Sequence, residues 1–340
     1  MKIFVTGGSG FLGSNFIKNA LSRGYQICNF DALTYAASLG NLDDVKYHPN
    51  YLFLKGDVRD KDFVEGAIFM HQPISIVHFA AESHVDNSIE CPTIVYDTNV
   101  IGTLNLLEAA RKYWDHISRD PNFRFHHIST DEVFGSLKTQ EFFTENSAYA
   151  PNSPYAASKA ASDHLVRSWN KTYNFPTSLS NCSNNFGPYQ FPEKFIPKVI
   201  VRALHNMSIP IYGNGQNIRD WIFVDDHSSA IMMILEKGKA GSRYNIGGNN
   251  ERTNIELAFA ICELLDTERP DRAPHNKLIE YVGDRPGHDF RYAVDSTKIR
   301  EELGWFAKTS FNCGLEKTVN WFVKNEERWL KFASEVKSND

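Results

Sequence analysis

A glycine-rich segment near the start of the chain constrains the fold most strongly. Thr6-Gly7-Gly8-Ser9-Gly10-Phe11-Leu12-Gly13 follows an apolar run at residues 3–5 and opens an amphipathic stretch at 11–21. Gly7, Gly10 and Gly13 have the spacing that allows a tight turn, a close approach of the backbone to a pyrophosphate and close packing of a helix on a strand. The helix that begins there offers free N–H groups to the phosphates. A glycine turn without a ligand is the alternative, and the strand–loop–helix context argues against it.

Short apolar runs alternate with amphipathic segments throughout the first half of the chain. We expect buried strands at residues 3–5, 27–30, 51–54, 74–79, 123–128 and 177–179, and helices at 11–21, 63–70, 95–114 and 155–173. Alternation of this kind predicts an α/β fold with a Rossmann-type, doubly wound parallel sheet.

Beyond about residue 181, proline, glycine, asparagine and aromatic residues become more frequent. Such segments are typical of loops that carry side chains to a ligand, and we expect helices between them at 195–204, 227–235, 255–265 and 314–329. A chain of 340 residues suffices for two lobes. We therefore expect a dinucleotide-binding domain over 1–180 and a smaller mixed α/β substrate-binding lobe over 181–340, with residues 215–245 returning to the first domain.

Composition argues against several classes of protein. The net charge of −5 and the pI near 6.2 are unlike those of a general nucleic-acid surface. No apolar run approaches the length that spans a membrane, and no secretory signal precedes the first strand. The five cysteines are scattered, as is typical of reduced thiols in the cytoplasm. We therefore expect a cytoplasmic protein that binds neither nucleic acid nor membranes.

An acidic residue at the end of the second expected strand indicates which dinucleotide is bound. Asp31 can accept hydrogen bonds from the hydroxyls of the adenosine ribose, and it would repel a 2′-phosphate. No Arg or Lys lies in residues 31–36 to balance that charge, so the sequence predicts NAD and not NADP. Asp57 and Val58, after the third expected strand, should flank the adenine. Ala80 and Ala81, after the fourth, are small enough to let the cofactor lie close.

Tyr155 and Lys159 are four residues apart, so they share one face of the expected helix. Tyrosine is a poor base at its ordinary pKa near 10, but a nearby ammonium and a positive nicotinamide would favour the phenolate. Tyr155 could then take the proton of a sugar hydroxyl while a hydride leaves the same carbon, and Lys159 could hold the nicotinamide ribose. Such a pair is common on ordinary helices, and its place after a glycine loop and five strands makes it a specific signal.

Thr130, Asp131 and Glu132 follow the fifth expected strand. Carboxyl ends of parallel strands face the ligand, so these residues should lie near the nicotinamide, although a loop start is the alternative for Thr130. Oxidation of a hexose at C4 makes the C5 proton acidic, after which a base can remove that proton while an acid protonates the departing C6 hydroxyl. The two carboxyl groups therefore indicate a dehydratase that returns the hydride to C6.

Long strings of the sequence resemble the extended short-chain dehydrogenase/reductase superfamily and, within it, the dTDP-glucose 4,6-dehydratase family. The likeness runs nearly from end to end. It is carried by residues 6–13, 30–35 (FDALTY), 80–86 (AAESHVD), 130–135 (TDEVFG), 155–159 (YAASK), 181–190 (NCSNNFGPYQ), 219–221 (RDW), 244–248 (YNIGG) and 284–289 (DRPGHD).

This resemblance implies tightly bound NAD that is recycled in each turnover. It implies conversion of dTDP-glucose to dTDP-4-keto-6-deoxyglucose, a precursor of rhamnose and other deoxysugars, with Glu132 as the base and Asp131 as the acid. It also implies a homodimer in which each subunit contributes the helices expected at 95–114 and 155–173.

The resemblance adds residues to both halves of the site. The cofactor would also contact Phe11, Leu12, Leu33, Thr34, Ser83, Thr98 and Asn185. The nucleotide sugar would contact Ser83, His84, Asn184, Lys194, Pro210, Tyr212, Arg219, Asn254, Arg285, His288 and Tyr292 beside the catalytic residues. Two arginines suit a clamp on a diphosphate, and surface ion pairs with Asp220 or Asp284 are the alternative for them. We predict no metal, because the adjacent histidines at 126 and 127 lack ligand spacing.

The chain departs from the family pattern at two positions. Asn87 stands where the family has Arg, which removes a positive charge near the active-site loop, and Phe186 stands where the family has Tyr. Neither replaces the proposed acid, base or phenol.

Three other functions share many of these features. A 4,6-dehydratase of a UDP-linked sugar binds a substrate whose nucleobase, uracil, lacks the methyl group of thymine. A contact with one methyl group supplies only about 1–3 kcal/mol of discrimination. A sugar-nucleotide 4-epimerase would share NAD, Tyr155 and Lys159 but would not need Asp131 and Glu132. A non-catalytic NAD-binding regulator would have little use for the five catalytic residues together.

Overall fold

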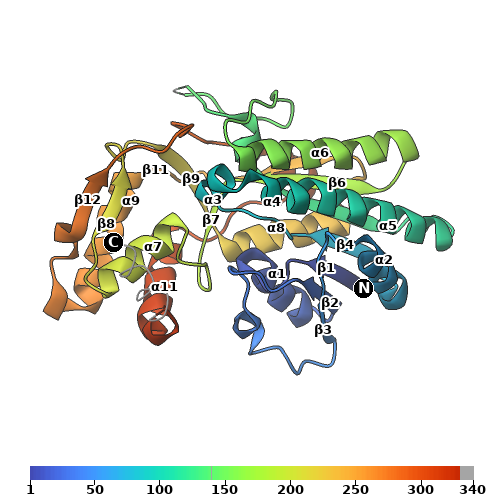
Figure 1. Ribbon diagram of the computed structural model, residues 1–340, viewed down its shortest axis with the longest axis horizontal. Helices are drawn as coiled ribbons and strands as arrows, with labels where there is room; N and C mark the ends of the chain where they lie inside the picture. Colours follow the sequence, from blue (N-terminus) through green and yellow to red (C-terminus); the bar gives the residue numbers. More distant parts are fainter. Residues whose placement is uncertain (139, 330–340) are drawn as a thin grey trace.

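The computed structural model describes residues 1–138 and 140–329. At its centre is a seven-stranded sheet with the order β10-β6-β5-β4-β1-β2-β3, in which every neighbouring pair is parallel (Figure 1). The predicted doubly wound parallel sheet is therefore confirmed. Its strands are β1 (Lys2–Thr6), β2 (Gln26–Asp31), β3 (Tyr51–Lys55), β4 (Ser75–His78), β5 (Arg124–Thr130), β6 (Thr177–Cys182) and β10 (Arg243–Ile246).

Helices cover both faces of this sheet, because each presents an apolar side to it. One face buries Phe16, Ile231 and Ile299 in a core with β1 and β6, and the other buries Phe4 and Phe125 in a second core. The helices of the first face are α1 (Phe11–Ser22), α8 (Val224–Lys237) and α10 (Thr297–Leu303). Those of the second are α2 (Lys61–His71), α5 (Gly102–His116) and α6 (Pro154–Tyr173).

The helix expected at 95–114 is longer and less regular than the periodicity predicts. It runs through α4 (Pro92–Tyr96), a π-helical turn η2 (Asp97–Ile101) and α5. Within the turn, the Asn99 amide accepts from Glu82 N at 2.8 Å and donates to Glu82 O at 3.0 Å. A π turn adds a residue to the helix and is common at functional sites. Here the turn binds the helical run to Glu82 in the loop that connects β4 to the short helix α3 (Val85–Glu90).

The second half of the chain forms a smaller lobe around its own apolar core. Phe186, Ile200, Leu265 and Phe322 are buried there. The lobe contains a three-stranded sheet of order β11-β9-β7 and a two-stranded sheet of β12 and β8. Its elements are β7 (Asn184–Phe186), α7 (Phe195–Leu204), β8 (Ile209–Tyr212), β9 (Ile218–Phe223), β11 (Glu251–Thr253), α9 (Asn254–Glu268), β12 (Ile279–Val282) and α11 (Phe311–Lys324).

The chain crosses between the two parts more than once. α8 packs on α1, and β10 pairs with β6 at the edge of the large sheet. The final helix is shorter than the expected 314–329: α11 ends at Lys324, Asn325 caps it, and the 3-10 turn η6 (Glu326–Trp329) follows. Further 3-10 turns are η1 (Leu39–Leu42), η3 (Asp131–Phe134), η4 (Pro270–Arg272) and η5 (His275–Leu278). Within the described residues, no helix combines the length and apolar content needed to cross a membrane.

Candidate active site

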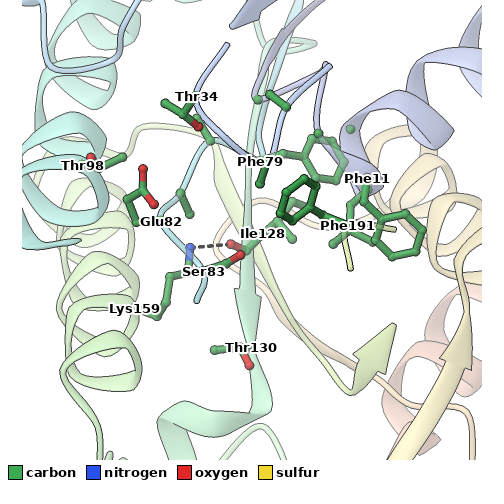
Figure 2. Close-up of a pocket in the computed structure, with 18 of the residues that line it drawn as sticks. Phe11, Thr34, Phe79, Glu82, Ser83, Thr98, Ile128, Thr130, Lys159 and Phe191 are labelled. Carbon is green, nitrogen blue, oxygen red and sulfur yellow. Dashed lines mark hydrogen bonds between the residues drawn. The ribbon is translucent and has the colours of Figure 1, made fainter. Parts of the chain in front are cut away.

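A cavity of about 340 Å³ opens along the carboxyl ends of β1, β2, β4 and β5 (Figure 2). The glycine loop forms one wall of it. Gly7 has φ +70°, and a Cβ there would lie 2.5 Å from Ala80 N. A Cβ on Gly13 would lie 2.3 Å from Gly7 O. Side chains are therefore excluded at both positions, which keeps the backbone beside β4 and the start of α1 open to a ligand.

The N-terminus of α1 points at this cavity without a protein partner for its first turn. Gly10 is the N-cap, no side chain caps the turn, and no acidic residue lies in it. The first N–H groups of a helix have no partner within the helix, and they carry a partial positive charge. Phe11, Leu12 and Gly13 all line the cavity. These groups fit a pyrophosphate.

Asp31 is held rigidly where a ribose would lie. Its carboxylate accepts hydrogen bonds from Ser9 N at 2.8 Å and Leu33 N at 2.7 Å. Burial raises its pKa, and these two bonds oppose that shift. Each carboxylate oxygen keeps a lone pair for a hydroxyl donor. Leu33, at φ +56°, acts through its backbone and is not among the residues that line the cavity.

The other residues predicted at the cofactor surround the same cavity. Asp57 also binds Arg59 through paired contacts, the shortest at 2.6 Å, so the adenine end carries a neutralised carboxylate. Figure 2 shows Thr34 and Thr98 on one side of the cavity and Phe11 on the other. The remaining predicted lining residues are Val58, Ala80, Ala81, Ser83 and Asn185.

Thr130 is the last residue of β5 and the N-cap of η3. Its hydroxyl accepts from Glu132 N at 3.3 Å and donates to Asp131 Oδ1 at 3.3 Å. Thr130 thus begins a turn, which was the alternative interpretation of this residue. The same turn places Asp131 and Glu132 at the cavity. All three residues line the cavity, close to Tyr155.

The environments of the two acids differ in charge. Burial raises the pKa of Asp131 well above its ordinary value, and the charges of Glu132 and Asp220 raise it further. Burial also raises the pKa of Glu132, but the charges of Arg285, Arg219 and Lys194 oppose that shift. The pKa of Asp131 is therefore raised further than that of Glu132, so Asp131 is the better proton donor of the pair and Glu132 the better base.

Tyr155 is buried at the start of α6, with 9% of its surface exposed. Burial raises the pKa of its phenol well above 10, and Glu132 is the largest charge that raises it; a hydrogen bond with Thr130 lowers it. Lys159 Nζ donates to Ile128 O at 2.8 Å, as the dashed line in Figure 2 shows. The Lys159 ammonium therefore binds a backbone carbonyl of β5. We expected its charge to favour the Tyr155 phenolate, and here that charge is directed at the strand.

Arg219 is buried beside Glu132 and Tyr292. Its guanidinium donates to Asp289 O at 2.9 Å and lies 4.3 Å from the centre of the Tyr292 ring. Asp220 instead accepts from the backbone N–H groups of Gly248 and Asn250. The alternative of an Arg219–Asp220 surface ion pair is therefore wrong.

Arg285 lies in a second group of polar side chains at the mouth of the site. Its guanidinium is 3.7 Å from Asp86, which also accepts from the Tyr212 hydroxyl at 3.4 Å. Asp284 is 2.7 Å from His288 Nδ1, so the carboxylate proposed as an alternative partner of Arg285 binds His288 through its side chain. His84 caps α3 nearby.

The remaining predicted substrate residues differ in how closely they approach the catalytic centre. Lys194 lines the cavity and donates to Ser83 O at 2.5 Å, which joins the smaller lobe to the loop after β4. Asn184 lines the cavity as well. Asn254 N donates to Asn217 O, which belongs to the segment around Arg219. Pro210 lies in β8, paired with β12, and none of the described contacts joins it to the catalytic residues.

Sequence reasoning missed several residues of the cavity wall. Glu82, Cys182, Phe191 and Glu193 line it. Phe191 packs edge-on against Tyr35 with ring centres 5.8 Å apart, so the loop after β7 covers part of the cavity. Phe191 directly follows residues 181–190, which carry the family resemblance, and Glu193 adjoins Lys194, a predicted substrate residue. This adjacency in sequence could have indicated both residues.

The two departures from the family pattern have different settings. Phe186 is fully buried against the rings of Trp221, Phe223 and Phe311, an aromatic neighbourhood that suits a ring without a hydroxyl. Asn87 lies at the mouth of the site, where its amide donates to the Tyr35 hydroxyl at 3.4 Å.

Comparisons with known proteins identify relatives of the chain. A family model described as GDP-mannose 4,6 dehydratase matches residues 4–318. The dTDP-glucose 4,6-dehydratase of Xanthomonas campestris pv. campestris (strain B100) is 52% identical over 331 residues, covering 96% of this chain and 94% of that protein. The dTDP-glucose 4,6-dehydratase 1 of Escherichia coli (strain K12) is 49% identical over 350 residues, covering 99% and 96%.

Solved structures show the same fold. The dTDP-glucose 4,6-dehydratase of Bacillus anthracis str. Ames, in complex with NAD, matches with a TM-score of 0.86 and 46% identity, covering 97% of this chain and 98% of that one. The enzyme of the same name from Streptomyces venezuelae, with NAD and TYD bound, gives a TM-score of 0.90 and 40% identity, covering 97% and 99%. From this agreement of sequence and fold, the chain belongs to the dTDP-glucose 4,6-dehydratase family.

Proposed function

We propose that the protein is a lyase that converts dTDP-glucose to dTDP-4-keto-6-deoxyglucose with NAD as its recycled oxidant. The observation that carries this proposal is the unequal environment of two adjacent acids in one cleft. Burial and neighbouring negative charge raise the pKa of Asp131 well above its ordinary value, while Arg285, Arg219 and Lys194 limit the rise that burial causes at Glu132. Elimination of water requires one acid and one base together, so this arrangement fits a dehydratase.

NAD supplies, when bound, the hydride acceptor for C4 and the hydride donor for C6. The residues that would hold it fit its parts: Asp31 fits the ribose hydroxyls, and the open N-terminus of α1 fits the pyrophosphate. The exclusion of side chains at Gly7 and Gly13 keeps that end of the cleft open.

The chain's own residues then have separate tasks. Tyr155 takes the proton of the C4 hydroxyl, with Thr130 hydrogen-bonded to the phenol. Glu132 removes the proton from C5. Asp131 gives its proton to the C6 hydroxyl as it departs. Lys159 supplies a positive charge on the same helix face as Tyr155.

The nucleotide end of the substrate would lie toward Arg219 and Arg285. Guanidinium groups match phosphate oxygens in two-point contacts, and Arg285 meets its carboxylate partner Asp86 only at 3.7 Å. A UDP-linked sugar is the second candidate substrate, because the nucleobases thymine and uracil differ by one methyl group. Turnover on dTDP-glucose and UDP-glucose, measured side by side, decides between them, and we expect dTDP-glucose to be preferred.

A 4-epimerase is the competing activity on this fold. The UDP-glucose 4-epimerase of Thermus thermophilus, solved in complex with NAD, matches with a TM-score of 0.84 and 29% identity, covering 95% of this chain and 99% of that one. The two activities give different products from dTDP-glucose, a 4-keto-6-deoxy sugar or the C4 epimer. Incubation without added NAD, followed by the alkali-induced absorbance of a 4-keto sugar, tests the proposal. Release of the epimer would overturn it.

We also propose a homodimer and a cytoplasmic location. Tyr96 in α4 and Ile101 in the turn η2 are exposed apolar side chains of one helical run, and α4 and α5 of that run pack beside α6 (Figure 1). Apolar residues gathered on one side of a helix favour pairing with a second copy. The cysteines are unpaired, as suits a reducing compartment. A product of this kind would feed the synthesis of rhamnose or another deoxysugar.

A further inference from the structure

A buried polar cluster lies beneath Lys159, and the roles assigned above do not use it. Its members are His127 on β5, Asp163 on α6, Tyr149 in the loop before α6 and Asn181 on β6. The side chain of His127 is 0% exposed and that of Asp163 is 1% exposed. A carboxylate so deeply buried is costly unless it is paired and hydrogen-bonded. Its partners therefore bear on what it does.

The imidazole of His127 lies between an ammonium and a carboxylate. His127 Nε2 is 3.4 Å from Lys159 Nζ and 3.4 Å from Asp163 Oδ1. Lys159 and Asp163 are four residues apart, so they project from the same face of α6. Both distances end at the same ring nitrogen, so the Asp163 carboxylate lies close to the Lys159 ammonium as a counter-charge inside the protein.

Asp163 is also tied to the turn that directs the catalytic acids. Its Oδ2 accepts from the Tyr149 hydroxyl at 2.6 Å and from Asn181 Nδ2 at 3.1 Å. The same Asn181 Nδ2 lies 2.9 Å from Thr130 O, to which it donates. One carboxylate thus supports Lys159 on one side and the end of β5 on the other.

Charges in this region are consistent with a paired ammonium and carboxylate. Burial lowers the pKa of Lys159 to about 8, and Asp163 is the largest charge that opposes this shift. Burial alone would raise the pKa of Asp163, but His127 and Tyr149 hold it below its ordinary value. Burial lowers the pKa of His127 to about 4, so the ring is neutral near pH 7. The titratable groups that face Lys159 or its partners are Tyr155 and Asp163 on α6, His127 on β5, His78 on β4, Cys182 on β6 and Tyr149.

We propose that Asp163 is a positioning residue for the reaction: with His127 between the two groups, its carboxylate keeps the Lys159 ammonium charged and in place on the catalytic face of α6. This inference rests on the proposed function, in which Lys159 supplies the positive charge that favours the Tyr155 phenolate. Asp163 touches neither sugar nor cofactor in this account. Its effect reaches the reaction only through the charge and position of Lys159.

The test is the variant Asp163→Asn, assayed on dTDP-glucose across the pH range. The alkaline limb of the kcat–pH profile should move to lower pH by about one unit. At pH values above both alkaline limbs, kcat of the variant should therefore be about ten-fold lower than that of the wild type. KM should change far less, because the substrate is not contacted. A lower melting temperature with an unmoved alkaline limb would mean that Asp163 has only a structural role, and it would overturn the proposal.

Two adjacent histidines provide a matched pair of variants if Asp163→Asn does not fold. His126 points to the opposite face of β5, where its nitrogens bind Ser178 and Ser180 at 2.9 and 3.1 Å. His127→Gln should move the alkaline limb to lower pH, and His126→Gln should leave it in place. Equal behaviour of the two variants would contradict the proposal.

A measurement without turnover separates this inference from the proposed function. Because the folded-state pKa of Lys159 lies below its unfolded value, the unfolded chain holds the extra proton between the two values, and the unfolding free energy rises with pH in that window. In Asp163→Asn prepared without NAD, this rise should begin at a lower pH than in the wild type. An identical onset would overturn the inference. Failure of the wild type to form a 4-keto sugar would instead refute the proposed function.

Discussion

At the scale of residues, the site depends on two neighbouring carboxyl groups whose pKa values are raised to different extents. Asp131 and Glu132 are adjacent in sequence and share the turn capped by Thr130. Their difference arises from position: the carboxylates of Glu132 and Asp220 act on Asp131, and three cations of the smaller lobe, Arg285, Arg219 and Lys194, act on Glu132. Sequence spacing could predict the pair. It could not predict which acid keeps its proton, because Arg219 and Arg285 lie far along the chain.

Asp131 should lower the stability of the fold at neutral pH. In the folded state it keeps its proton, while the unfolded chain ionises it above about pH 4, so the unfolding free energy falls as pH rises toward the folded pKa. Each unit of pH in that window costs about 1.4 kcal/mol. Asp131→Asn should therefore be more stable than the wild type at pH 8, by at least about 1 kcal/mol, and the gain should shrink at pH 5.

Urea denaturation of both proteins at the two pH values checks this expectation. The exposed Asp62 on α2 provides the control, and Asp62→Asn should show no comparable dependence on pH. Equal stability of Asp131→Asn and the wild type at pH 8 would mean that Asp131 is ionised in the folded protein.

At the scale of elements, the contact of β1, the glycine loop and α1 decides whether the cofactor can bind. A methyl group on Gly13 would lie 2.3 Å from Gly7 O and 2.6 Å from Gly8 Cα, and this backbone cannot yield cheaply. Gly13→Ala should therefore displace the start of α1 and abolish the retention of NAD on purification. The ratio of bound nicotinamide to protein, measured by absorbance, reports the loss.

Gly66 is the matched control for that substitution. It also lies within a helix, α2, and a Cβ there would meet no atom within 4 Å. Gly66→Ala should keep NAD and stabilise the helix by up to about 1 kcal/mol. Retention of NAD by Gly13→Ala would show that the loop tolerates a side chain and would contradict its assigned role.

The elements of the large sheet could be predicted from the sequence because they alternate regularly and bury apolar runs. The π turn at Asp97–Ile101 could not, since its cause is the bond between the Asn99 side chain and the distant backbone of Glu82. The break after Lys324 was missed for a similar reason: apolar periodicity continues to Trp329, and the cap formed by Asn325 ends the helix locally. Both errors come from side chain–backbone hydrogen bonds that compete with a periodic pattern.

At the scale of the whole molecule, the smaller lobe contributes Arg219, Arg285 and Lys194, and the larger part contributes the two acids together with Tyr155 and Lys159. Contacts such as Lys194 with Ser83 and Phe191 with Tyr35 join the two across the cleft. The sequence could predict that both lobes supply ligand contacts. It could not predict that His127 would meet Asp163 beneath Lys159, because that contact depends on how α6 crosses β5.

The proposed dimer gives a prediction at this scale. Ile101 lies in the turn η2 between α4 and α5 and is 46% exposed. Ile101→Glu would place a charge in the interface of two copies, which is costly without a partner, so sedimentation should show mainly monomers where the wild type forms dimers. Phe306 is 58% exposed on the other side of the sheet, after α10, and Phe306→Glu should leave the dimer intact. A wild type that sediments as a monomer would refute the dimer.

The most direct test of the account is hydrogen exchange at C5 of the sugar. Wild type, Asp131→Asn and Glu132→Gln are each incubated with dTDP-glucose in heavy water, and deuterium at C5 is measured by mass spectrometry and NMR. We expect Asp131→Asn to exchange the C5 hydrogen while losing little water, because the base remains and the acid is gone. We expect Glu132→Gln to show no exchange at C5. Exchange in Glu132→Gln at the wild-type rate would contradict the assignment of base and acid on which the proposed reaction depends.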